Sequence, residues 1–152
     1  MTAPIATRAS ATVRILLVDD NKSGLAARRS VLEELDYEIV TSDNPEEALV
    51  LFSKSPFDIA VVDYKMPRMN GIEFIQRARK ASPEVALILL SGFADAMGLD
   101  EENTGADAVI QKSANEVSHL LRGIGRLLRR KVLKKPPANH AVGQPARRKG
   151  LR

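Results

Sequence analysis

Short apolar runs alternate along this chain with segments whose apolar residues recur at helical spacing. The runs lie at residues 14–18, 37–41, 57–62, 85–90 and 106–110. Continuous apolar runs are typical of strands buried on both faces, and strands separated by helices pair in parallel through right-handed crossovers. The sequence therefore predicts an α/β fold, a doubly wound (βα)5 three-layer sandwich built on a parallel sheet.

The segments between the apolar runs are predicted to be helices. They cover residues 22–35, the stretch from 44 onward, 72–81, 94–103 as a weaker candidate, and the stretch from about 113 onward. Asn44 is a favourable N-cap, and Pro45 suits the first helical position. The apolar residues of the last helix are expected to cover the sheet as far as Ile124.

Composition excludes several kinds of site. The chain has no Cys, which excludes disulfides, thiolate metal sites and a Cys nucleophile. The N-terminal residues lack the apolar core of a signal peptide, and no apolar run approaches the roughly 18 residues of a membrane span. These features predict a cytoplasmic protein without a membrane span.

Charge divides the chain into an acidic body and a basic end. Residues 1–121 hold 12 Lys/Arg and 19 Asp/Glu, whereas residues 122–152 hold 11 Lys/Arg and no acid. We expect a flexible arm over 1–12, one domain over 13–130, and a disordered basic tail over 131–152. The tail either keeps the protein soluble or contacts nucleic acid or anionic surfaces. It lacks aromatic residues for base stacking, so sequence-specific reading is not expected.

Polar side chains end four of the five predicted strands. They are Asp19 and Asp20 after the first strand, Asp63 after the third, Ser91 after the fourth and Lys112 after the fifth. Taken singly, each has an ordinary explanation as a helix cap, a turn residue or a surface charge. In an open parallel sheet, however, the carboxyl ends of the strands converge and ligands bind beyond them. Their joint occurrence therefore favours one site.

These residue types fit one kind of chemistry. Three carboxylates held together raise each other's pKa, and a hard cation such as Mg²⁺ relieves their repulsion. A carboxylate can also act as a nucleophile toward phosphorus and become an aspartyl phosphate. The oxygens of a transferred phosphoryl group then need donors and positive charge, which Ser91 and Lys112 would supply.

The stretches that carry these residues resemble the receiver domain of two-component response regulators. They read ILLVDDN at 15–21, VVDYKMPRMNG at 61–71, LLSG at 89–92 and GADAVIQK at 105–112. The resemblance covers about residues 13–130 and implies a flavodoxin-like fold with the strand order 2-1-3-4-5. It is most specific in the motif Asp-x-x-Met-Pro-x-Met-x-Gly that begins at Asp63.

The resemblance also implies a function. Asp63 would accept a phosphoryl group from a histidine kinase or phosphotransfer protein. Mg²⁺ would be held by Asp19, Asp20, Asp63 and the backbone carbonyl of Lys65, and Ser91 and Lys112 would bind the phosphoryl oxygens. The chain would be a single-domain response regulator, monomeric or weakly dimeric. It would not be an enzyme, although it would support its own phosphorylation and dephosphorylation, and it would change its binding to a protein target.

Two residues depart from the family pattern. Val109 stands where the family usually has an aromatic switch residue, and Ser113 stands where Lys112 is usually followed by a cis-proline. We predict a trans bond before Ser113, because a cis bond to a residue other than proline costs about 2.5–4 kcal/mol. The side chain of Lys65 is expected either to pair with the phosphate or to point into solvent.

Two other functions compete with the phosphoacceptor. The departures at Val109 and Ser113 would suit a pseudo-receiver, a protein-binding module that no longer depends on phosphate. A phosphatase with an Asp nucleophile typically needs a second Asp two residues later, where this chain has Lys65. The sequence shows no Walker loop and no Gly-x-Gly-x-x-Gly, so it gives no support to nucleotide binding.

Overall fold

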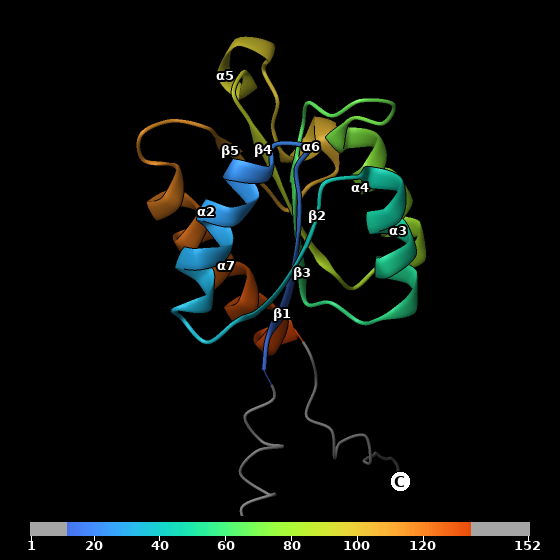
Figure 1. Cartoon of the computed structure of the whole chain (residues 1–152), viewed down its shortest axis with the longest axis vertical. Coiled ribbons are helices and arrows are strands. Elements are labelled where there is room, and N and C mark those ends of the chain that lie inside the picture. Colours follow the sequence, from blue (N-terminus) through green and yellow to red (C-terminus); the bar gives the residue numbers. More distant parts are fainter. Residues whose placement is uncertain (1–11, 135–152) are drawn as a thin grey trace, which may run out of the picture.

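A computed structural model describes residues 12–134, which form one five-stranded parallel sheet covered by helices on both faces (Figure 1). The strands are β1 (Arg14–Val18), β2 (Glu38–Ser42), β3 (Ile59–Asp63), β4 (Ala86–Ser91) and β5 (Ala108–Gln111). They lie in the order β2-β1-β3-β4-β5, and every neighbouring pair is parallel. The predicted fold class and strand order are confirmed.

The longer helices form the two outer layers, and two short helices lie in the connection from β4 to β5. They are α2 (Lys22–Glu33), α3 (Pro45–Lys54), α4 (Gly71–Ala81), α5 (Ala94–Met97), α6 (Glu101–Thr104) and α7 (Glu116–Lys134). In Figure 1, α2 and α7 lie on one side of the sheet and α3 and α4 on the other. Each side has its own hydrophobic core: Leu32 and Ile124 belong to the first, and Phe52 and Phe74 to the second.

Asparagine caps start the three helices that follow β1, β2 and β3. The side chains of Asn21, Asn44 and Asn70 each accept a hydrogen bond from the backbone N–H three residues later, at 2.9–3.0 Å. Such caps satisfy backbone donors that the helix leaves free. Because Asn21 caps α2, the neighbouring Asp20 is not needed for that purpose.

The structure corrects several predicted boundaries. The single helix expected over 94–103 is two short helices, because Gly98 adopts a left-handed conformation with φ of 67° and ends α5. The helix predicted over 22–35 ends at Glu33, and Leu35, which lies beyond that end, is exposed. The last helix begins at Glu116 and continues to Lys134, beyond residue 130 where we placed the domain boundary. The proposed arm and tail fall largely outside the described residues.

The loop from β3 to α4 is held tightly against the sheet. The motif methionines Met66 and Met69 are buried, and the backbone N–H of Gly71 donates to the carbonyl of Tyr64 at 2.8 Å. A Cβ at Gly71 would lie 2.6 Å from Cδ1 of Leu89 and 2.7 Å from the carbonyl oxygen of Asp63. The glycine of the motif is therefore explained by this close approach of backbone to backbone.

Strand β5 forms one edge of the sheet, and a side chain covers part of that edge. The carboxylate of Glu101 accepts a hydrogen bond from the backbone N–H of Val109 at 3.0 Å. This contact joins α6 to the strand and occupies a donor that would otherwise face outward.

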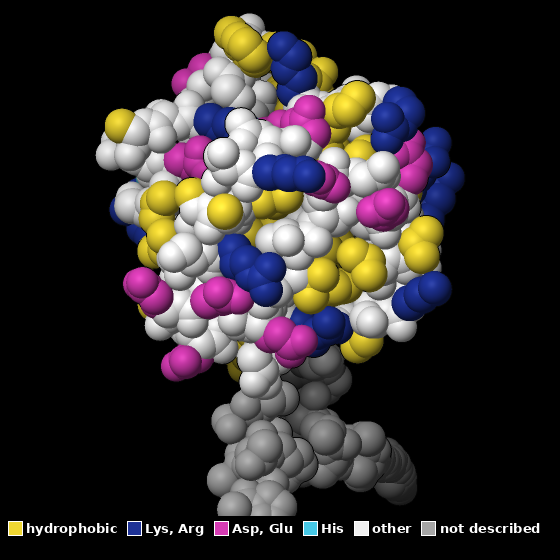
Figure 2. Space-filling model, in the orientation of Figure 1, with side chains coloured by type: hydrophobic (Ala, Val, Ile, Leu, Met, Phe, Trp, Pro, Cys, Tyr) yellow, Lys and Arg dark blue, Asp and Glu magenta, His cyan; other side chains and the backbone are white. Residues whose placement is uncertain are grey.

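Acidic and basic side chains are interspersed over the face drawn in Figure 2, and hydrophobic side chains gather at its top, over α5. Phe93, the residue before α5, and Met97 at its end are 53% and 49% exposed. None of the helices in residues 12–134 is both long and apolar enough to cross a membrane.

We predict that Gly71→Ala destabilises the protein by about 1–3 kcal/mol, because the new methyl group must displace the backbone at the end of β3. Urea unfolding measures this change. Gly125→Ala is the control: its Cβ would make an ordinary 3.5 Å contact with Arg129, and alanine favours the helix by up to about 1 kcal/mol. Equal stability of the two variants would contradict this explanation of Gly71.

Candidate functional site

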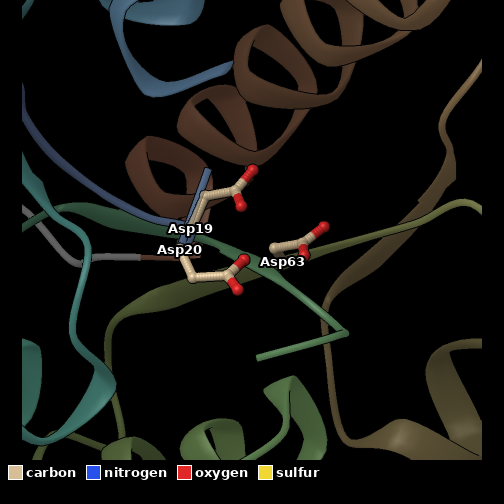
Figure 3. A group of neighbouring side chains, drawn as sticks. All are labelled: Asp19, Asp20 and Asp63. Carbon is tan, nitrogen blue, oxygen red and sulfur yellow. The ribbon is translucent and has the colours of Figure 1, made fainter. Parts of the chain in front are cut away.

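The register of the sheet brings the first and third strand ends together. Val18, the last residue of β1, is paired with Val62 of β3, so Asp19 and Asp63, which follow these two residues along the chain, are neighbours. Figure 3 shows Asp19 and Asp20 at the end of β1 with Asp63 at the end of β3. One carboxylate oxygen from each of the three residues lies within 4.8 Å of the others.

The other two strand ends complete the same edge. Asp63 is paired with Leu90 in the next strand, and Ser91 in turn is paired with Gln111. The backbone N–H of Lys112 donates to the carbonyl of Ser91 at 2.8 Å, which fixes where the lysine leaves the sheet. The structure thus places all five predicted side chains along one edge, as the strand-end argument required.

The acidic cluster has donors suited to a hard divalent cation. Asp19 and Asp63 are 2% and 5% exposed, whereas Asp20 is open to solvent. Two buried carboxylates close together are unfavourable without positive charge nearby, and an exposed third ligand gives a cation an approach from solvent. Carboxylate oxygens with water at the open side are the ligands that Mg²⁺ prefers.

Lys112 supplies part of the compensating charge. Its Nζ lies 2.5 Å from Oδ1 of Asp63 and 3.6 Å from Oδ2 of Asp19. Burial raises the pKa of Asp63 and the negative charge of Asp19 raises it further, while the hydrogen bond from Lys112 opposes both. Asp63 is consequently a carboxylate that ionises less readily than an exposed one.

Arg28 is a second cation at the site, and it was missed from the sequence. Its Nη1 donates to Oδ2 of Asp19 at 2.8 Å, and its Nε donates to the carboxylate of Glu116, in the first turn of α7, at 2.6 Å. Burial acts to lower the pKa of Arg28, but the two ion pairs outweigh it and raise that pKa, so the guanidinium stays charged. The signal was its helical spacing from Leu25 and Leu32, which points it inward.

Gln111 was also missed, and it ties the loop after Ser91 to β5. Its side chain donates to the carbonyl of Gly92 at 2.7 Å and accepts from the backbone N–H of Asp95 at 2.9 Å. Ser91 itself is 1% exposed, and its Oγ accepts from the backbone N–H of Phe93 at 3.0 Å. The loop that follows Ser91 is therefore held by the hydroxyl of Ser91 on one side and by the side chain of Gln111 on the other.

The remaining predicted positions behave differently from one another. The Nζ of Lys65 lies 5.7 Å from the centroid of the Phe93 ring, so this exposed side chain leans toward α5. The described residues contain no cis peptide bond, which confirms the predicted trans bond before Ser113. Val109 is half-buried in β5.

Comparison with known proteins identifies the family. The model of the response regulator receiver domain matches residues 15–122. The response regulator receiver protein CpdR from Brucella abortus is 27% identical over 115 residues, which are 76% of this chain and 96% of CpdR. The virulence sensor protein BvgS from Bordetella bronchiseptica is 30% identical over 139 residues, which are 86% of this chain but only 11% of BvgS.

Solved structures agree with these matches. A CheY-like receiver domain protein from Methanospirillum hungatei has a TM-score of 0.76 and 31% identity, covering 82% of this chain and all of its own. The response regulator TrrA from Thermotoga maritima, solved with Mg²⁺ and BeF, has a TM-score of 0.70 and 32% identity, covering 76% of this chain and 99% of its own.

The raised pKa of Asp63 predicts a pH-dependent cost in stability. The folded protein binds this proton more tightly than the unfolded chain, so the free energy of unfolding falls as the pH rises between the two pKa values. Asp63→Asn cannot ionise and escapes this loss. In metal-free buffer, the stability of the variant relative to the wild type should therefore grow as the pH rises above about 4, the ordinary pKa of an Asp carboxyl.

Urea unfolding at a series of pH values from about 4 upward measures the effect, with the exposed Asp95→Asn as the control. A difference between Asp63→Asn and the wild type that stays constant with pH would show that ionisation of Asp63 costs the fold nothing.

Proposed function

This chain belongs to the response regulator receiver domain family, and we propose on that basis that it accepts a phosphoryl group on Asp63. The donor would be a phosphohistidine of a histidine kinase or of a phosphotransfer protein. The observation that carries the proposal is the position of Asp63, buried at a strand end beside Asp19 and within 2.5 Å of Lys112. Asp58 and Asp107, in contrast, are occupied by structural hydrogen bonds to backbone N–H groups.

The proposed reaction is a displacement at phosphorus. Lys112 holds Oδ1 of Asp63, which leaves Oδ2 as the attacking oxygen. A P–O bond to Oδ2 forms while the P–N bond of the phosphohistidine breaks, and the imidazole that leaves takes up a proton from water. Lys112 and the hydroxyl of Ser91 then stand at the strand ends where the phosphoryl oxygens need donors.

Mg²⁺ is the cation that the site fits. Asp19, Asp20, Asp63 and the backbone carbonyl of Lys65 would hold it, and when bound it supplies positive charge against the phosphoryl oxygens. The relative TrrA was solved with Mg²⁺ and BeF, which supports this choice. Removal of divalent cations should accordingly stop phosphorylation.

We propose that the chain is a phosphoacceptor that also supports loss of its own phosphate, and that it acts by changing its binding to a protein target. Ser91 is the natural start of the response, because its loop ends at the contacts of Gly92 and Asp95 with Gln111. If the hydroxyl of Ser91 moved toward the phosphate, it would strain the two hydrogen bonds of the Gln111 side chain. Val109 has no aromatic ring that could rotate as the family's switch residue does. In our proposal, a change in the hydrogen bonds of Gln111 takes the place of that rotation.

The phosphoacceptor proposal is tested with acetyl phosphate and Mg²⁺, followed by intact mass spectrometry. The wild type should gain one phosphoryl group, Asp63→Ala should gain none, and the exposed control Asp95→Ala should behave as the wild type. Addition that survives in Asp63→Ala, or no addition to the wild type, would sink the proposal.

A pseudo-receiver that binds its target without phosphate is the second candidate, and Val109 is the observation that favours it. Beryllofluoride with Mg²⁺, read by backbone amide NMR shifts, separates the two. The phosphate-dependent proposal predicts shifts at Gly92, Asp95 and Gln111 that Asp63→Asn abolishes. Shifts confined to Asp19, Asp63 and Lys112 would favour the pseudo-receiver instead.

A further inference from the structure

A buried arginine on the inner face of α2 has a place in the site that the proposed phosphoryl transfer does not use. Arg28 is 8% exposed and follows Leu25 on the face that packs on the sheet. A buried guanidinium is tolerated only where its charge and its N–H groups are paired. Its partners therefore indicate what it is for.

The guanidinium joins the acidic cluster to the first turn of α7. One nitrogen, Nη1, binds Oδ2 of Asp19 at 2.8 Å, and another, Nε, binds Glu116 at 2.6 Å. Each partner lies on a different element, the end of β1 and the start of α7. Arg28 thus links a carboxylate at the cation site with a helix on the outside of the sheet.

Gly24, which has no side chain, leaves room for the guanidinium of Arg28 beside Asp19. A Cβ at Gly24 would lie 3.3 Å from Nη1 of Arg28 and 3.5 Å from Oδ2 of Asp19. A side chain there would press on the pair from the preceding turn of α2. Glycine weakens a helix interior, so its presence in this helix is accounted for by the room that it gives this ion pair.

The pair has a direct consequence for cation binding at Asp19. Oδ1 of Asp19 accepts from the backbone N–H of Asn21 at 2.9 Å, and Oδ2 accepts from Arg28, so both oxygens have protein donors. A divalent cation that binds Asp19 must share an oxygen with one of these donors or replace it. The positive charge of Arg28 also repels the cation across a buried distance that solvent screens weakly.

We propose that Arg28 sets the divalent-cation affinity of this site by competing for Asp19, and that cation binding shifts its pairing toward Glu116 on α7. The inference rests on the proposed function, since the cation in question is the Mg²⁺ required for phosphorylation of Asp63. Arg28 is a positioning residue in this scheme. Because coupling between two sites is reciprocal, contacts that strengthen the Arg28–Glu116 pair strengthen cation binding.

The test is a titration of the full chain with Mn²⁺, a cation that accepts the same oxygen ligands as Mg²⁺, with free Mn²⁺ measured by electron paramagnetic resonance. Arg28→Met keeps the buried stem and removes the charge, so it should bind Mn²⁺ about fivefold more tightly or better. Arg29→Met is the matched control, because it removes the same charge from an exposed position on α2. It should leave the affinity within about twofold.

Glu116→Gln provides a second prediction of opposite sign. Without Glu116, Arg28 has only Asp19 as an anionic partner, so the cation should bind several-fold more weakly. In the Arg28→Met background the same substitution should have little effect, because Glu116 acts through the arginine. If Glu116→Gln weakens Mn²⁺ binding equally in the wild-type and Arg28→Met backgrounds, Glu116 acts only through its own charge. That result would overturn the proposed shift in the pairing of Arg28.

Further outcomes separate this inference from the proposed function. If Arg28→Met does not fold, as judged by circular dichroism, Arg28→Gln makes the same removal of charge with a polar side chain. Suppose that the Arg28 variants bind Mn²⁺ no more tightly than the wild type, while Asp20→Asn in the wild-type background still weakens Mn²⁺ binding. That result overturns the role of Arg28 and leaves the cation site standing. If Asp20→Asn leaves the Mn²⁺ affinity of the otherwise wild-type protein unchanged, the cation does not bind at the proposed site. That result would overturn both the cation site and the inference that depends on it.

Discussion

Two buried carboxylates, Asp19 and Asp63, sit side by side where neighbouring strands end, and the top of the molecule is arranged around their charge. Burial raises the pKa of Asp63, and the negative charge of Asp19 raises it further. The register of β1 and β3 sets this proximity, so the fold itself imposes the electrostatic problem. The compensating cations come from other elements: Lys112 follows β5, and Arg28 projects from α2.

This arrangement makes the site a junction between the sheet and its helices. The charge of Asp63 is balanced by a lysine whose backbone is hydrogen-bonded to Ser91, and the charge of Asp19 by an arginine that also holds Glu116 of α7. In the proposed scheme, a new charge at Asp63 would therefore act through Lys112 on the loop after β4, and a new charge at Asp19 would act through Arg28 on the first turn of α7. A phosphoryl group on Asp63 and a cation on Asp19 would be felt by different parts of the structure.

The sequence was sufficient for the fold and for the members of the site that stand directly after strands. Apolar runs predicted the strands, and residues that end parallel strands must share an edge. It failed where backbone conformation or long-range pairing decides: Gly98 adopts a left-handed conformation and divides the helix expected over 94–103. The helix that carries Arg28 was predicted, but its partner Glu116 is 88 residues away in the sequence. No pattern in the residues around Arg28 indicates that contact. Gln111 was missed for the same reason.

The side chain of Glu101 on the backbone of Val109 has a consequence for self-association. An open β-strand invites another chain to add itself by main-chain hydrogen bonds, the first step toward domain swapping and fibre growth. On β5 one of these outward donors is already taken by a carboxylate, which repels acidic chains and must be displaced before a visiting strand can pair. Loss of this side chain would free the N–H of Val109 and leave that part of the β5 edge open to pairing with another strand.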